Sequence, residues 1–251
     1  MAEKAETSGQ REKENESKKS GPPPVAKAYL LLYNGLLTAG WFVVLYRTVL
    51  YSIDHAPSWR SDGIPTSVPG LYDDLRLPLR VFQTAACLEV VHVAVGIVRS
   101  ALFTTFIQVF SRIFMLWGIV EGVAGTAYSP GLLLVAIAWS ATEVIRYSFY
   151  FFALIDAIPY PIKWLRYTTF YILYPTGVTG ELMLSFAALP VLKASHQWST
   201  SLPNPYNLSF SFYYFLMFFM ALYIPLFPQL YGHMISQRKK VIGGGAKSKQ
   251  E

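Results

Sequence analysis

Residues 132–155 read LLLVAIAWSATEVIRYSFYFFALI, and this stretch decides the fold. A helix needs about 20 mainly apolar residues to cross the hydrocarbon core of a bilayer, and this run is long enough. Hydropathy predicts five further spans of the same kind. The six predicted spans are residues 29–51, 81–98, 101–123, 132–155, 164–191 and 210–233. The sequence therefore predicts an all-α, polytopic membrane helix bundle with six transmembrane helices.

The composition agrees with a membrane protein. Of the 251 residues, 53% are hydrophobic and 14% are charged, whereas a soluble domain carries about 25% charged residues. Residues 1–24 are rich in Glu, Lys, Ser and Gly, which predicts a disordered cytosolic tail. Residues 25–235 are the predicted six-span domain, and residues 236–251 are a predicted basic cytosolic tail. The basic residues lie in the tails and short loops, so we expect no nucleic-acid partner.

The distribution of Lys and Arg predicts the orientation in the membrane. Most of them fall on one side if both termini are cytosolic, as the positive-inside rule requires. Lys247 and Lys249 stand near the C-terminus in a pattern that resembles a dilysine retrieval signal. We therefore expect a multi-pass protein of the endoplasmic reticulum membrane with both termini in the cytosol.

The run YPTGVTGE, residues 174–181, places a phenol and a carboxyl group inside an apolar span. A charged carboxylate near the bilayer centre costs roughly 2.5 kcal/mol or more, so a functional role is the default interpretation. Seven residues turn a helix by about 700°, which puts Tyr174 and Glu181 on one face. Gly177 and Gly180 allow a backbone or a substrate to approach closely.

Other ionisable residues also fall within the predicted spans. Glu89 and His92, and likewise Glu143 and Arg146, are three residues apart and can partner one another on a helix face. Polar contacts between helices are the alternative role for these four residues. Arg112 has no local partner. It either pairs with an acid on another helix or holds an anionic group of a substrate.

The sequence predicts no metal site. A di-metal helix bundle needs the Glu-x-x-His motif twice and further carboxylates, but Glu89 and His92 supply it once. Residues 92–99 are similar to the phosphate-binding loop of protein tyrosine phosphatases. That chemistry needs a thiolate where this chain has Val93, so no phosphatase activity is expected.

The Tyr174 and Glu181 pair suits elimination of water. Removing water from a 3-hydroxyacyl thioester requires a base for the C2 proton and an acid for the departing C3 hydroxyl. We favour Glu181 as the base and Tyr174 as the acid. The sequence leaves the reverse assignment open.

Several ordered motifs resemble the eukaryotic very-long-chain (3R)-3-hydroxyacyl-CoA dehydratases, once named protein-tyrosine-phosphatase-like proteins. They include WSATEVIRYSF at residues 139–149, KWLRY at 163–167, YPTGVTGE at 174–181 and YIP at 223–225, within a likeness that covers roughly residues 28–238. The resemblance implies dehydration of (3R)-3-hydroxyacyl-CoA to trans-2-enoyl-CoA, the third step of very-long-chain fatty acid elongation. It implies Tyr174 and Glu181 as catalytic residues.

The same resemblance implies no metal or redox cofactor, CoA being part of the substrate. The implied partners are membrane lipid and the condensing enzyme, ketoacyl reductase and enoyl reductase of the elongation cycle. Arg99, Lys163 and Arg166 are candidate contacts for the CoA phosphates, with membrane anchoring as their alternative role. Arg112 and Gly177 complete the candidate substrate-binding set.

Two other functions compete with the enzyme. One is a non-catalytic membrane scaffold or lipid carrier associated with the elongation machinery. The other, a proton-coupled transporter, ranks last because the chain has no visible inverted repeat. The presence of both Tyr174 and Glu181 favours the enzyme, because a scaffold has no need for both.

Overall fold

The computed structural model describes residues 23–63, 65–203, 205 and 207–243. Most of the predicted N-terminal tail, and residues 244–251 of the predicted C-terminal tail, lie outside this range. The elements are α2 (Pro24–Asp62), α3 (Leu71–Ala85), α4 (Cys87–Ala94), α5 (Leu102–Ile113), the π-helix η1 (Phe114–Val120), the 3-10 helix η2 (Thr126–Tyr128), α6 (Gly131–Leu154), α7 (Tyr160–Thr168), α8 (Phe170–Ser195), α9 (Phe212–Ala221) and α10 (Tyr223–Ile242).

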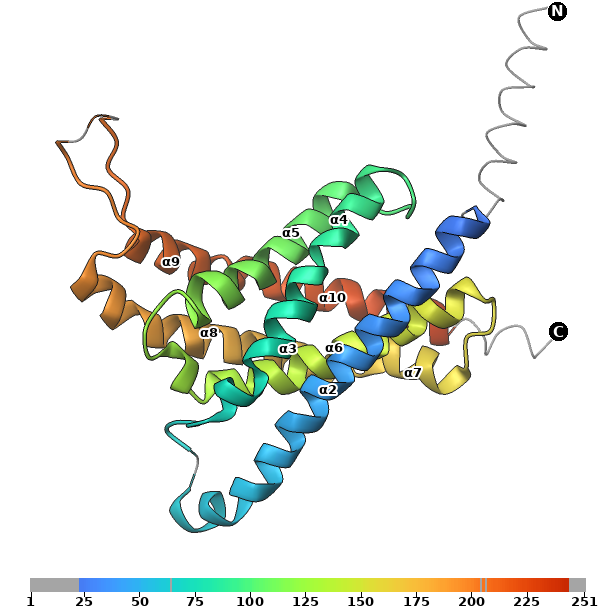
Figure 1. Ribbon diagram of the computed structural model, residues 1–251, viewed down its shortest axis with the longest axis horizontal. Coiled ribbons are helices and arrows are strands. Elements are labelled where there is room, and N and C mark those ends of the chain that lie inside the picture. The colour runs from blue at the N-terminus through green and yellow to red at the C-terminus, as the bar shows by residue number, and fades with distance from the viewer. Residues whose placement is uncertain (1–22, 64, 204, 206, 244–251) are drawn as a thin grey trace, which may run out of the picture.

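Six stretches of the described chain are long and apolar enough to cross a membrane, which confirms the predicted fold class. They are Pro24–Ser61, Leu71–Ala94, Leu102–Val120, Gly131–Leu154, Phe170–Ser195 and Phe212–Ile242. In Figure 1 the start of α2, α7 and the end of α10 lie toward the right. The α2–α3 and α8–α9 connections lie toward the left, so the spans run back and forth between two ends of the bundle.

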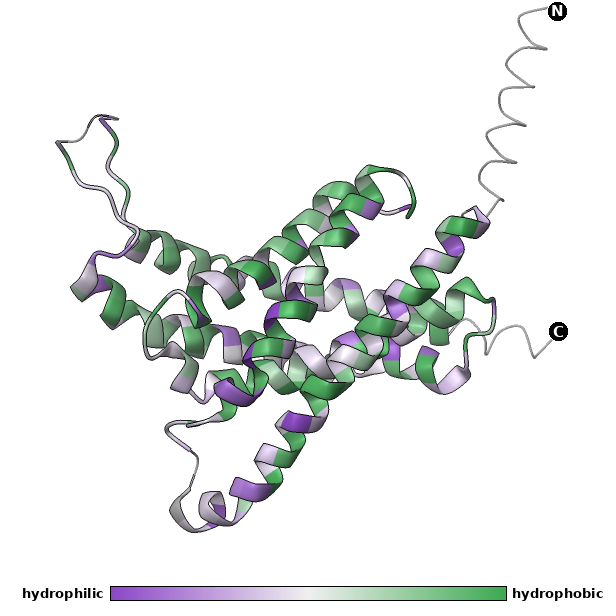
Figure 2. Cartoon of the chain, in the orientation of Figure 1, coloured by the Kyte–Doolittle hydropathy of each residue, from purple (hydrophilic) through white to green (hydrophobic). Residues whose placement is uncertain are grey.

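The outer surface of the bundle is apolar. Large hydrophobic side chains such as Leu32 on α2, Phe103 on α5 and Phe218 on α9 are more than 60% exposed. Figure 2 shows hydrophobic residues along most of α5 and α9. Such continuous apolar faces suit contact with lipid, because a soluble monomer rarely exposes large apolar patches.

Helix α6 is the centre of the bundle. It packs along α2 on one side and along α8 on another. Its buried residues run from Gly131 to Tyr147, and Trp41 of α2 and Leu184 of α8 are among the most buried side chains around it. The fourth span therefore packs directly against the helix that carries Tyr174 and Glu181.

Several span boundaries differ from the prediction: the first span extends to Ser61 rather than residue 51 and the sixth to Ile242 rather than residue 233, and the second and fifth spans also change. The second span begins at Leu71 rather than at residue 81, because α3 is amphipathic. It buries Leu71, Leu75 and Leu79 on one face, while Asp73 and Asp74 lower its average hydropathy. The predicted fifth span, residues 164–191, is divided at Thr169 into the short α7 and the long α8.

Helices α6 and α8 approach each other at two glycines. A Cβ atom added to Gly180 would lie 2.8 Å from the carbonyl oxygen of Gly131, and one added to Gly131 would lie 2.6 Å from the carbonyl oxygen of Gly180. Close backbone contact through small residues is a common way for helices to associate in membranes. The residue next to Glu181 is thus fixed against the central helix.

We expect Gly180→Ala to destabilise the protein, because its new methyl group would overlap the backbone of α6. Overpacking of this kind costs about 1–3 kcal/mol. Thermal unfolding in detergent would measure the change. Gly232→Ala is the matched control, because a Cβ atom at Gly232 meets nothing within 4 Å. Equal melting temperatures for the two variants would contradict the proposed contact.

Candidate active site

Tyr174 and Glu181 both face α10, which agrees with the shared helix face predicted from their spacing. Tyr174 stacks on Phe227, with ring centroids 5.0 Å apart, and lies 6.3 Å from the ring of Tyr231. Glu181 contacts Tyr223. The three α10 residues are four positions apart and so form one stripe along that helix.

Each oxygen of the Glu181 carboxyl group accepts a hydrogen bond. The indole Nε1 of Trp139 on α6 donates to Oε1 at 2.9 Å, and the hydroxyl of Tyr223 on α10 donates to Oε2 at 2.6 Å. Two helices therefore hold one carboxyl group that a third helix supplies.

The hydroxyl of Tyr174 differs from that of Tyr223. It makes no hydrogen bond to any residue that the structure describes, although its ring is half-buried and stacked. A phenol held by its ring with a free hydroxyl is able to donate a proton or a hydrogen bond to a bound molecule.

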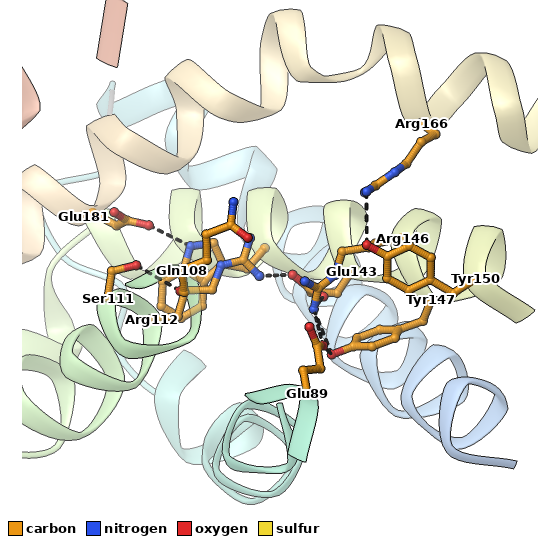
Figure 3. Close-up of polar contacts among 11 residues, drawn as sticks. Glu89, Gln108, Ser111, Arg112, Glu143, Arg146, Tyr147, Tyr150, Arg166 and Glu181 are labelled. Carbon is orange, nitrogen blue, oxygen red and sulfur yellow. Dashed lines mark hydrogen bonds and ion pairs between the residues drawn. The ribbon is translucent and has the colours of Figure 1, made fainter. Parts of the chain in front are cut away.

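Buried charges next to this site form a chain of ion pairs (Figure 3). Glu143 of α6 is 1% exposed and pairs with Arg112 of α5 and, at 2.7 Å, with Arg146. Arg146 in turn pairs with Glu89 of α4 at 2.6 Å, and Tyr147 donates a hydrogen bond to the same carboxylate. These ion pairs join the second, third and fourth spans.

The predicted partners of these charges are partly correct. Glu143 and Arg146 pair as expected, and Arg112 pairs with an acid on another helix, which was one of its two predicted roles. Glu89 and His92 do not pair. Glu89 bonds to α6, whereas His92 Nε2 lies 2.9 Å from the hydroxyl of Tyr29. Helix packing turned the two side chains toward different neighbours.

The remaining predicted site residues are more widely spread. Arg166 on α7 donates a hydrogen bond to the hydroxyl of Tyr150 at 3.3 Å, and Lys163 is one turn earlier on α7. Arg99 lies in the connection between α4 and α5. Gly177 is buried against α6, where an added Cβ atom would lie 3.5 Å from that of Ala138.

Metal ligands do not gather within the described residues. No group of three or more His, Cys, Asp or Glu side chains is arranged there to hold an ion.

These features define a polytopic membrane protein with a carboxyl group and a phenol inside the bundle. A family profile described as "Protein tyrosine phosphatase-like protein, PTPLA" matches residues 83–244. The chain belongs to this family, as the resemblance in its motifs indicated.

Similar proteins come from animals and plants. The mouse (Mus musculus) "Very-long-chain (3R)-3-hydroxyacyl-CoA dehydratase 2" is 48% identical over 90% of this chain and 85% of its own length. The mouse "Very-long-chain (3R)-3-hydroxyacyl-CoA dehydratase 1" is 45% identical over 93% and 79%. "PASTICCINO 2" of Arabidopsis thaliana, also named as such a dehydratase, is 39% identical over 90% and 97%. No solved structure matches the chain.

Sequence reasoning assigned no role to Trp139 and Tyr223, the two donors to Glu181. Both are amphipathic aromatic residues of a kind that is common in spans, so hydropathy and charge do not distinguish them. They lie about 40 residues from Glu181 on either side, and only the packing of α6 and α10 against α8 brings them to it. Motif spacing carries no signal of that kind.

We expect Glu143→Gln to destabilise the protein strongly, because Arg112 and Arg146 would each lose an anionic partner. Breaking a buried ion pair from one side costs about 3–5 kcal/mol. Thermal unfolding in detergent is again the measurement. The control is Asp156→Asn, the same chemical change at an exposed turn. If both variants melt at the temperature of the original protein, the ion-pair chain does not support the fold.

Proposed function

We propose that this chain is a (3R)-3-hydroxyacyl-CoA dehydratase of very-long-chain fatty acid elongation, producing trans-2-enoyl-CoA. The observation that carries the proposal is the placement of Tyr174 and Glu181 against one stripe of α10, inside a bundle of the PTPLA family. The names of its relatives support the same reaction.

The proposed step uses both groups at once. Glu181 takes the proton from C2 of the substrate, the electron pair forms the C2–C3 double bond, and the C3 hydroxyl leaves as water with a proton from Tyr174. The substrate loses one hydrogen atom and one hydroxyl group. The proton that Glu181 took from C2 then passes to the deprotonated Tyr174, so both residues regain their starting states. The hydroxyl of Tyr174 bonds to no described residue, which supports its role as the acid.

Arg112 is the proposed group for the thioester oxygen, on which negative charge develops as C2 is deprotonated. Its guanidinium lies 5.7 Å from the centre of the Trp139 ring, and that indole bonds to Glu181. The side chain is 26% exposed and pairs with Glu143 through one nitrogen, Nη1. A guanidinium has five N–H donors, so further donors are left for a substrate.

The substrate is proposed to enter from the cytosolic end, where α7 carries Arg166 and Lys163. These two residues, with Arg99, are the proposed contacts of the CoA phosphates, and Gly177 is proposed to border the bound substrate. The protein is proposed to lie in the endoplasmic reticulum membrane with both termini in the cytosol. Its proposed partners are the condensing enzyme, ketoacyl reductase and enoyl reductase.

We expect Tyr174→Phe and Glu181→Gln each to lose most of the dehydratase activity, by roughly 10²-fold or more, since each removes one of the two proton-transfer groups. The assay is conversion of 3-hydroxypalmitoyl-CoA to its trans-2-enoyl-CoA by purified protein in detergent. Tyr171→Phe, a phenol removed from the same helix, is the control and should keep its activity.

If the protein without substitutions is folded but inactive, the enzyme proposal is overturned in favour of a scaffold or lipid carrier. Full activity in both Tyr174→Phe and Glu181→Gln would instead keep the enzyme and move its catalytic residues elsewhere.

We expect Arg166→Gln to raise the KM for the CoA thioester by about three- to tenfold, because a charge-assisted contact to phosphate is lost. The kcat should change little. A pantetheine thioester of the same acyl chain is the matched substrate, because it lacks the nucleotide and most of the phosphate charge. An equal rise in KM for both substrates would rule out a phosphate contact.

A further inference from the structure

The carboxyl group of Glu181 is held at both oxygens by donors from two different helices. Tyr223 reaches Oε2 at 2.6 Å, and Trp139 reaches Oε1 at 2.9 Å. Rotation of the carboxyl group about its own axis would break both bonds at once. A carboxylate oxygen can accept two hydrogen bonds, so each oxygen of Glu181 keeps a lone pair for another partner.

Both donors are themselves fixed. Trp139 is 4% exposed, and the Arg112 guanidinium lies over its ring at 5.7 Å. Tyr223 stands at the first position of α10, directly after the break that separates α10 from α9 at Leu222. Its ring meets Phe219 edge to face at 5.8 Å. Pro225 has no backbone N–H to bond the carbonyl of Ala221, which suits a helix break at this level.

We infer that Tyr223, together with Trp139, is a positioning residue that aims the Glu181 carboxyl group at the substrate. This inference rests on the proposed dehydratase function. A base must meet the C2 proton at a defined distance and angle, and a misplacement of about 1 Å can cost 10²-fold in rate. A glutamate on one helix has three rotatable side-chain bonds, and two anchored donors remove that freedom before the substrate arrives.

The two phenols that face the site therefore have different tasks. Tyr223 commits its hydroxyl proton to Glu181, whereas the hydroxyl of Tyr174 bonds to no described residue and is free for the substrate. Tyr223 acts on the reaction only through Glu181.

The first test is infrared spectroscopy of the purified protein in detergent. The spectrum of the original chain minus that of Glu181→Gln identifies the carboxyl band of Glu181. This band should shift in Tyr223→Phe, because one hydrogen bond to the group is lost. It should stay in place in Tyr214→Phe, a control that removes a phenol from the exposed face of the same span. The readout needs no enzymatic activity.

The second test is steady-state kinetics with 3-hydroxypalmitoyl-CoA. Tyr223→Phe should lower kcat about tenfold or more and change KM less than twofold, since a misaimed base slows the chemical step and leaves binding intact. Tyr214→Phe should match the original chain, and melting temperatures verify that both variants fold. Trp139→Phe should also shift the carboxyl band and lower kcat.

The outcomes separate the two proposals. An unshifted band in folded Tyr223→Phe overturns the hydrogen bond and with it the positioning role. A shifted band with an unchanged kcat overturns the positioning role while the dehydratase stands. An inactive original chain overturns the dehydratase, and with it the catalytic purpose of the contact, even if the band shifts.

Discussion

Lipid surrounds these helices, so an ionised side chain between them needs an opposite charge within reach, and this requirement organises the centre of the bundle. Glu143 lies between two arginines, and one of them continues to Glu89 on the second span. The ion pairs thereby tie α4, α5 and α6 together at one level. Arg112 is the last residue in this series of ion pairs, and its guanidinium also lies over the ring of Trp139, which bonds to Glu181. The ion pairs that hold the helices together and the carboxyl group of the candidate site thus both contact residues of α6.

The candidate site itself is assembled from three spans with separate duties. Helix α8 supplies the phenol and the carboxyl group, and its glycine contact fixes its distance from α6. Helix α6 supplies the indole donor, and α10 supplies both a hydroxyl donor and the rings that stack on Tyr174. Helix α10 bonds to one proposed catalytic residue and stacks on the other, so its placement fixes the side chains of both.

The sequence predicted what depends on single helices and missed what depends on their packing. Six spans follow from apolar length, and the common face of Tyr174 and Glu181 follows from helical geometry. Glu89 and His92 do not partner each other but bond to other helices, which was the alternative role given for them, because spacing within a helix says nothing about which neighbour a side chain meets. The early start of the second span was missed, because a charged stripe on α3 masks its buried leucines in a hydropathy average. The roles of Tyr174 and Glu181 remain predictions.

The backbone contact at Gly180 has a consequence for how such a chain can diverge. Because Gly180 faces the Gly131 carbonyl, and Tyr174 and Glu181 flank that contact on one face of α8, the register of this segment cannot slip. An insertion or deletion of one residue between 174 and 181 would rotate everything beyond it by about 100°. Related chains are therefore free to exchange side chains along this segment but not to change its length, and alignments of the family should be gapless from residue 174 to 181.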